Sequence, residues 1–194
     1  MASAKNTDPA RRSRLKGDLT GTHVRLRPPL PGETTLLFQW LNTPELTAPW
    51  DRFSLDSYAS FEKNLHSSSE DDGSLYPRFV IAKIEDDRPI GVVGFYRAHP
   101  VFEGYDLWYA LCDVSERRKG YGKEAVGLTL DFLFAHTRSE RVGATSDVEN
   151  ESSYRLLESL GFRREGTLRR ALFHHGDWHD VFVYGVTRGE WIKK

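Results

Sequence analysis

Two glycines stand one residue apart in a basic stretch, and their spacing suggests ligand chemistry. The stretch reads Arg117-Arg118-Lys119-Gly120-Tyr121-Gly122-Lys123 and runs into a segment whose apolar period predicts a helix. Glycines let backbone N–H groups come close to a ligand, because no Cβ stands in the way. The start of a helix adds unpaired N–H groups and a partial positive charge. The pattern therefore predicts a backbone cradle for an anion, most simply a phosphate or pyrophosphate.

A dinucleotide is one candidate for this cradle. The segment from Gly120 to Ala125 formally fits the pattern G-x-G-x-x-A, and Asp147 follows near the ribose-binding position. However, the residues from Asp113 to Arg118 separate the preceding strand from the first glycine, where that fingerprint requires a tight turn. The strand–helix–strand unit that contains the glycines also lies late in the chain, after several strands that are expected to be antiparallel. A P-loop is excluded as well, since no Lys-Ser or Lys-Thr follows the glycines.

Apolar periodicity and turn signals predict the elements that position this loop. Alternating or continuous apolar runs indicate strands, and apolar residues at helical spacing indicate helices. The expected strands are 23–27, 78–84, 90–97, 105–112, 141–148, 162–173 and 178–187, and the expected helices are 31–41, 55–65, 121–136 and 150–160. Antiparallel hairpins come first, and a strand–helix–strand–helix unit then surrounds the glycines. This order predicts an α/β fold with one mixed central β-sheet flanked by helices.

Length and composition bound the class of protein. With 194 residues, 39% of them hydrophobic, we expect a single domain over residues 21–194. Residues 1–20 are expected to form a disordered basic tail, or else a docking arm for an acidic partner or nucleic acid. The net charge of −1 gives no general attraction to nucleic acid, and no apolar run is long enough for a membrane span or a signal peptide. The single cysteine excludes an intramolecular disulfide, so we expect a cytoplasmic protein.

A second motif lies downstream of the glycines. From Asn150 to Phe162 the chain reads Asn-Glu-Ser-Ser-Tyr-Arg-Leu-Leu-Glu-Ser-Leu-Gly-Phe. Together with Arg117-x-x-Gly120-x-Gly122, this motif resembles the GCN5-related N-acetyltransferase family, and in particular its ribosomal-protein-alanine acetyltransferase (RimJ/RimL)-like subgroup. Further segments similar to that subgroup are Val24-Arg25-Leu26-Arg27-Pro28, Glu165-Gly166, Asp180–Tyr184 and Glu190-Trp191. The resemblance spans residues 23–191.

The resemblance implies a sheet that splays between its fourth and fifth strands, and it implies acetyl-CoA as the cofactor. The pyrophosphate would rest on the backbone of the glycine loop, and the pantetheine arm would bond to the exposed edge of the fourth strand. The backbone N–H that stabilises the oxyanion would lie near Leu111. The cofactor-binding residues expected on this basis are Leu111, Cys112, Arg117, Arg118, Lys119, Gly120, Tyr121, Gly122, Lys123, Asn150 and Ser153.

Acetyl transfer to an amine needs a group that takes the amine proton, and it benefits from one that protonates the leaving thiolate. By the resemblance, Asp106 near the start of the fourth strand is the candidate base; the alternative is a solvated strand-edge carboxylate. In many relatives a tyrosine seven residues after the motif asparagine is the acid that protonates the thiolate, but here that position is Leu157. Ser153, which the ribosomal subgroup also has, is therefore the candidate acid. Its alternative role is a hydrogen bond to the cofactor or a first-turn helix contact.

Other side chains suggest other chemistry. Cys112 would suit a cysteine acyltransferase, but no histidine is evidently paired with it, and a buried core thiol is the simpler interpretation. A polar group near the end of the chain consists of His174, His175, Asp177, His179 and Asp180. The spacing of His175 and His179 suits metal binding on a helix. Gly176-Asp177 predicts a hairpin turn there instead, so no metal site is expected.

The acceptor is the least determined part of the reaction. The resemblance implies that the loop between the first two helices covers the acceptor site, so Trp50 is expected to contact the acceptor. Asp106 on the fourth strand is expected to contact it as well. Acidic residues near this mouth favour a small cationic amine such as an antibiotic or polyamine: Glu45, Asp51, Glu62 and Ser69–Asp72. The alternatives are the N-terminal α-amine of a protein and, in another class, a catalytically silent CoA-binding sensor or scaffold. We expect a monomer or homodimer, with no membrane or nucleic-acid partner.

Overall fold

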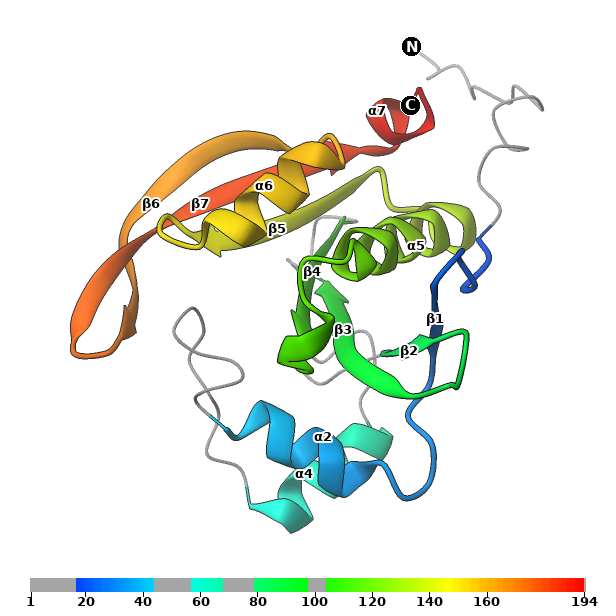
Figure 1. The fold of residues 1–194 in the computed structure, drawn as a ribbon. Helices are drawn as coiled ribbons and strands as arrows, with labels where there is room; N and C mark the ends of the chain where they lie inside the picture. Colours follow the sequence, from blue (N-terminus) through cyan, green and yellow to red (C-terminus); the bar gives the residue numbers. More distant parts are fainter. Residues whose placement is uncertain (1–16, 44–56, 68–78, 98–103, 194) are drawn as a thin grey trace.

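The computed structural model describes residues 17–43, 57–67, 79–97 and 104–193 (Figure 1). The strands are β1 (Val24–Arg27), β2 (Phe79–Lys83), β3 (Pro89–Arg97), β4 (Gly104–Leu111), β5 (Arg141–Asp147), β6 (Arg163–His174) and β7 (Asp177–Thr187). The helices are α2 (Thr34–Leu41), α4 (Tyr58–Ser67), α5 (Tyr121–His136), α6 (Glu151–Ser159) and α7 (Arg188–Ile192), with a 3₁₀ turn η1 at Val114–Glu116. The strands and the first four of these helices lie close to their expected positions.

The described strands form one sheet in the order β1-β2-β3-β4-β5-β7-β6. Neighbouring strands are antiparallel except β4 and β5, which are parallel and connected through α5. A parallel pair needs such a crossover, because a tight hairpin reverses the chain direction. The mixed sheet with flanking helices confirms the expected fold class.

The sheet separates two apolar cores, and the residues of β2 show how. Phe79 and Ile81 belong to a large core beneath α5 and α6, whereas Val80 and Ala82 belong to a smaller core beneath α2 and α4. Successive side chains of a strand point to opposite faces of the sheet. The continuous apolar run of β2 is therefore buried by helices on both sides.

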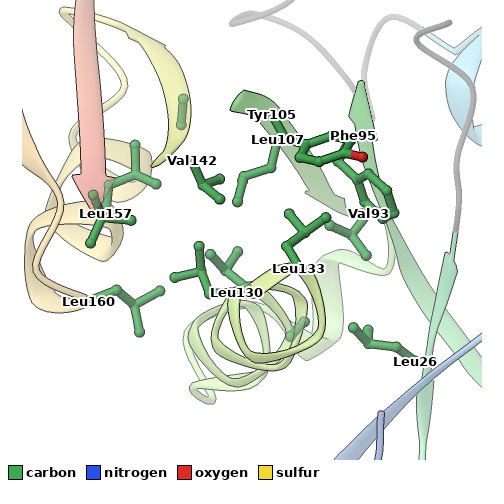
Figure 2. Close-up of a cluster of buried hydrophobic side chains, with 14 of the residues drawn as sticks. Leu26, Val93, Phe95, Tyr105, Leu107, Leu130, Leu133, Val142, Leu157 and Leu160 are labelled. Atoms are coloured by element: carbon green, nitrogen blue, oxygen red, sulfur yellow. The ribbon is translucent and has the colours of Figure 1, made fainter. Parts of the chain in front are cut away.

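Figure 2 shows the large core between α5 and the sheet. Leu130 and Leu133 of α5 point toward the strands, and Leu157 of α6 closes the core from the other end. Each such side chain contributes about 1.5–3 kcal/mol when it is fully buried. This packing holds α5, and the glycines at its start, against β4.

Two segments differ from the sequence-based expectation. Helix α2 begins at Thr34 rather than near Pro31, because Gly32 turns the chain with a φ of 94° before the helix starts. Helix α7 was not expected at all. Its signal is a capping box in which Thr187 and Glu190 satisfy each other's backbone N–H groups.

The described chain begins inside the range expected to be a tail. Leu19 packs against the large core, and its carbonyl accepts a hydrogen bond of 2.7 Å from the N–H of Leu26. Thr20 forms a β-bridge with Arg25. Residues 17–20 are thus tied to β1, since Leu19 supplies an apolar side chain for the core. Residues 1–16 lie outside the described part.

Strands β6 and β7 form a long hairpin that extends beyond the rest of the sheet (Figure 1). Its turn contains His175 and Gly176, both with positive φ, where a turn was expected. Strand β7 also pairs with β5 along the whole length of β5, from Arg141 to Asp147. The hairpin is therefore fixed in register against the strand that ends beside α6.

Candidate active site

Strands β4 and β5 separate after a short parallel contact. Only the first three residues of β4 are paired with β5, and the last of these pairs is Asp106 with Gly143. From Leu107 onward β4 is paired with β3 alone, whereas β5 continues along β7. The two strands diverge after the Asp106–Gly143 pair, and the region between them, which widens toward the end of β4, is called the wedge below (Figure 1). This is the expected splay.

Backbone groups of β4 face the wedge. The N–H of Cys112 donates to the carbonyl of Ile90 in β3. Because the direction of bonding alternates along a strand, the N–H groups of Leu111 and Tyr109 point the other way, into the wedge. An extended ligand arm in the wedge can therefore bond to β4 as an added strand would.

The glycine loop, Arg117–Lys123, follows β4 and η1 and leads into α5 beyond the wide end of the wedge. Gly120 is the N-cap of α5 with a φ of 87°, and Arg118 has a φ of 64°. No side chain caps this helix, so its first N–H groups are left for a ligand or for water. A Cβ at Gly120 would meet nothing within 4 Å, which shows that the space above it is open. The loop has the form of an anion cradle.

The second glycine of the motif has a different role. Gly122 is buried, and a Cβ there would lie 3.3 Å from Leu156 Cδ1 and 3.5 Å from Leu111 Cδ1. It therefore allows α5 to approach α6 and β4 closely. The two glycines therefore shape the site differently. Gly120 allows a positive φ in the loop, and Gly122 leaves room for close packing of the helix.

A buried carboxylate holds the glycine loop in place. Glu116, only 4% exposed, accepts hydrogen bonds from Arg88 at 2.5 Å and from Lys119 at 2.8 Å, and Lys83 lies 3.7 Å away. The hydrogen bond from Lys119, together with that from Arg88, lowers the pKa of Glu116. Arg88 also pairs with Asp113, which caps η1. The network joins the loop to the β2–β3 turn and keeps Glu116 ionised.

A side-chain hydrogen bond spans the wedge on the side of α6. The hydroxyl of Tyr109 lies 3.1 Å from Oγ of Ser153, in the first turn of α6. Burial raises the pKa of Tyr109 to about 12 despite the opposing effect of this hydrogen bond, so the phenol keeps its proton at neutral pH. The structure thus gives the predicted acid Ser153 a protonated partner that sequence reasoning missed.

Asn150 begins α6 as its N-cap. Its Oδ1 accepts hydrogen bonds from the N–H of Ser153 at 3.1 Å and from the hydroxyl of Ser152 at 2.9 Å. This use of the oxygen fixes the orientation of the side chain, so that its NH₂ group remains as the donor for a ligand.

Asp106 lies at the narrow end of the wedge, on the face of the sheet opposite α5. A Cβ at Gly143 would overlap Oδ1 of Asp106, so the carboxylate lies over this glycine. Burial raises the pKa of Asp106, the nearby Arg141 opposes this shift, and Glu165 adds to it. A carboxylate with a raised pKa is a stronger base than one in open water.

Cys112 is placed in the smaller core rather than in the wedge. Its side chain is 2% exposed among residues of α2 and α4, and burial raises its pKa to about 12. Its N–H is already bonded to Ile90. The thiol is protonated and enclosed, as the interpretation of a core cysteine predicts.

Three further polar side chains meet at the end of β5 on the same face as Asp106. His174 Nε2 and His179 Nδ1 lie 3.0 Å and 3.3 Å from Oδ2 of Asp147. The sequence grouped these histidines with Asp177 and Asp180, whereas the β5–β7 register brings them to Asp147. Sequence spacing gave no signal for this partner, 27 residues before His174.

Several expected acceptor residues cannot be placed. Trp50, Glu45, Asp51 and Ser69–Asp72 lie outside the described residues. Glu62 is exposed on α4. Among the described helices, none is long and apolar enough to cross a membrane.

Comparison with known proteins identifies relatives of this arrangement. The sequence model of the acetyltransferase (GNAT) domain matches residues 23–163. An uncharacterised N-acetyltransferase of the SPbeta prophage in Bacillus subtilis strain 168, YokL, is 36% identical over 111 residues. That match covers 57% of this chain and 55% of YokL, so the chain spans little more than half of this relative.

Solved structures share the fold. The spermidine N-acetyltransferase of Vibrio cholerae, crystallised with CoA and spermine, matches with a TM-score of 0.77 and 19% identity over 87% of this chain and 98% of its own. RimJ of Mycobacterium smegmatis, in complex with CoA-disulfide, matches with a TM-score of 0.72 and 24% identity over 86% of this chain and 83% of its own. At these identities the likeness establishes the fold.

Proposed function

Because this chain belongs to the acetyltransferase (GNAT) domain family, we propose that it is an N-acetyltransferase. It would transfer the acetyl group of acetyl-CoA directly to a primary amine within a ternary complex. The observation that carries the proposal is the wedge between β4 and β5, with an uncapped glycine helix start beyond its wide end. The wedge suits a thioester arm, and the helix start suits a diphosphate.

The glycine loop fits the diphosphate of the cofactor. Backbone N–H groups from Arg118 to Lys123 would hold the phosphate oxygens, and the open space above Gly120 leaves room for them. Four exposed basic side chains surround this backbone and would offset the negative charge: Arg117, Arg118, Lys119 and Lys123. The arm would bond to the N–H groups of Tyr109 and Leu111 and to the NH₂ group of Asn150. The N–H of Leu111 would also stabilise the charge that develops on the carbonyl oxygen.

Asp106 and Ser153 stand on opposite faces of the sheet, which suits direct transfer. Tyr109 and Ser153 lie on the α6 side, whereas Asp106 lies on the side of α2 and α4. The amine would enter from the Asp106 side and give up its proton to that carboxylate. The thiolate would leave on the Ser153 side and take a proton from its hydroxyl, which Tyr109 orients.

The Tyr109–Ser153 pair yields a graded prediction. Ser153→Ala should lower kcat about 100-fold, since general acid catalysis contributes at least this much. Tyr109→Phe should lower kcat only about fivefold, because it removes one orienting hydrogen bond worth about 1 kcal/mol. Steady-state kinetics at saturating acetyl-CoA measure both. Tyr154→Phe is the control, as this neighbouring ring packs edge-on against Phe182 and should leave kcat unchanged. Equal rates for Ser153→Ala and the wild type would remove Ser153 as the acid.

We propose a small cationic amine as the acceptor, for example a polyamine or an aminoglycoside. The carboxylate of Asp106 at the narrow end of the wedge attracts an ammonium group before its deprotonation. The acidic residues Glu45, Asp51 and Ser69–Asp72 remain predicted parts of the same mouth.

Release of free thiol from acetyl-CoA tests this function. We expect release with spermidine or an aminoglycoside and tight acetyl-CoA binding by calorimetry. Release with N-terminal peptides alone would instead support a protein acceptor. Binding of acetyl-CoA without release by any amine would indicate a sensor, and no binding at all would contradict the proposal.

A further inference from the structure

A cluster of nitrogen and oxygen donors lies at the end of β5, and the proposed function uses none of its side chains. It consists of Asp147 at the end of β5, His174 at the end of β6 and His179 in β7. One ligand atom from each residue lies within 4.8 Å of the others. The side chain of Asp147 is fully buried, and those of His174 and His179 are 8% and 17% exposed. The fold thus places three largely buried potential metal ligands side by side.

Two distances within the cluster fall in the range found between ligands of one ion. Oδ2 of Asp147 lies 3.0 Å from Nε2 of His174 and 3.3 Å from Nδ1 of His179. Two ligand atoms that are each about 2.1 Å from an ion are about 3.0–3.4 Å apart at octahedral or tetrahedral angles. Two imidazoles with one carboxylate suit first-row transition metals, whereas Mg²⁺ and Ca²⁺ prefer oxygen ligands.

Neighbouring groups hold the three side chains in place. The rings of His174 and His179 stack with centroids 3.8 Å apart and planes at 22°. Oδ1 of Asp147 accepts the N–H of Glu149 at 2.7 Å, which orients the carboxylate and leaves Oδ2 toward the histidines. Oε2 of Glu149 lies 3.9 Å from Nδ1 of His179, outside the group of three donors.

We propose that Asp147, His174 and His179 bind a divalent transition-metal ion such as Zn²⁺. The ion fastens the β6–β7 hairpin to the end of β5. The carbonyl of Asp147 also accepts the N–H of Asn150, so the same ion steadies the start of α6. The role of the ion is structural, and the proposal stands independently of the acetyl acceptor.

Metal titration of the untagged, chelator-treated protein tests the proposal. We expect one Zn²⁺ per chain by calorimetry, a higher melting temperature with Zn²⁺, and a d–d absorption band when Co²⁺ is added. His179→Gln keeps a hydrogen-bond donor for Asp147 but lacks the imidazole. It should bind at least about 100-fold more weakly, since loss of an outer partner alone costs 10–100-fold.

His175→Ala is the matched control and should bind Zn²⁺ like the wild type, because this exposed histidine packs edge-on against the His174 ring and is not one of the three donors. The melting temperature of metal-free His179→Gln shows whether that variant is folded. His174→Ala provides a second test of the site. Wild-type protein that binds no Zn²⁺ at 100-fold excess overturns the proposal, and so does equal affinity in folded His179→Gln and His174→Ala.

Discussion

Replacing Gly120 with valine is expected to weaken acetyl-CoA binding at least tenfold and to leave the fold intact. The φ of 87° at Gly120 costs an L-residue about 1–2 kcal/mol, and more when it is β-branched. If valine keeps this φ, its side chain occupies the open space above the loop. If it relaxes to negative φ, the N–H groups turn away from the ligand. Calorimetric titration with acetyl-CoA measures the loss.

Gly127→Ala is the matched control for this variant. Gly127 lies in the same helix, and a Cβ there would make ordinary contacts at 3.9 Å with Leu160 and Trp191. This variant should bind acetyl-CoA like the wild type and gain about 0.5–1 kcal/mol of stability from the better helix propensity. Unaltered affinity in Gly120→Val would show that the cradle does not hold the cofactor.

Asp106→Asn is expected to lower kcat about 100-fold or more, because the amine loses its base. Burial raises the pKa of Asp106, and the carboxyl acts only when it is deprotonated. In the wild type, kcat should therefore rise with pH through a value above the ordinary range of aspartate. The pH profile of the variant should lack this rise and keep only the rise that reflects deprotonation of the amine. A pH profile of kcat at saturating substrates distinguishes the two, and an unchanged profile would exclude Asp106 as the base.

Stability separates this effect from misfolding. A carboxyl with a raised pKa destabilises the folded state once pH has risen through that pKa, because the charged form is poorly solvated there. Asp106→Asn removes this penalty, so its melting temperature at pH 7 should equal or exceed that of the wild type. Gly143→Ala offers a second route to the same defect, since the added methyl displaces the Asp106 carboxylate. It should lower kcat and leave acetyl-CoA affinity unchanged.

Local sequence was sufficient to predict the parts of this fold that depend on neighbours along the chain. Helix α5 was predicted with its bounds, because Gly120 marks its start and the apolar period continues to its end. Asn150 was expected to open α6, and it caps that helix through the N–H of Ser153 three residues later. Helix α7 was missed although Thr187 and Glu190 carry its signal, since a five-residue helix has almost no periodicity.

The sequence by itself thus predicted the family from two local motifs, the glycine turn before α5, and the order of strands and helices along the chain. Only the tertiary structure decided which distant side chains meet. Tyr109 reaches Ser153 across the wedge, 44 residues away. Asp147 meets His174 and His179 because strand register aligns them. Register depends on how each strand packs against its neighbours and the core, and a one-residue slip would turn each of these side chains to the other face.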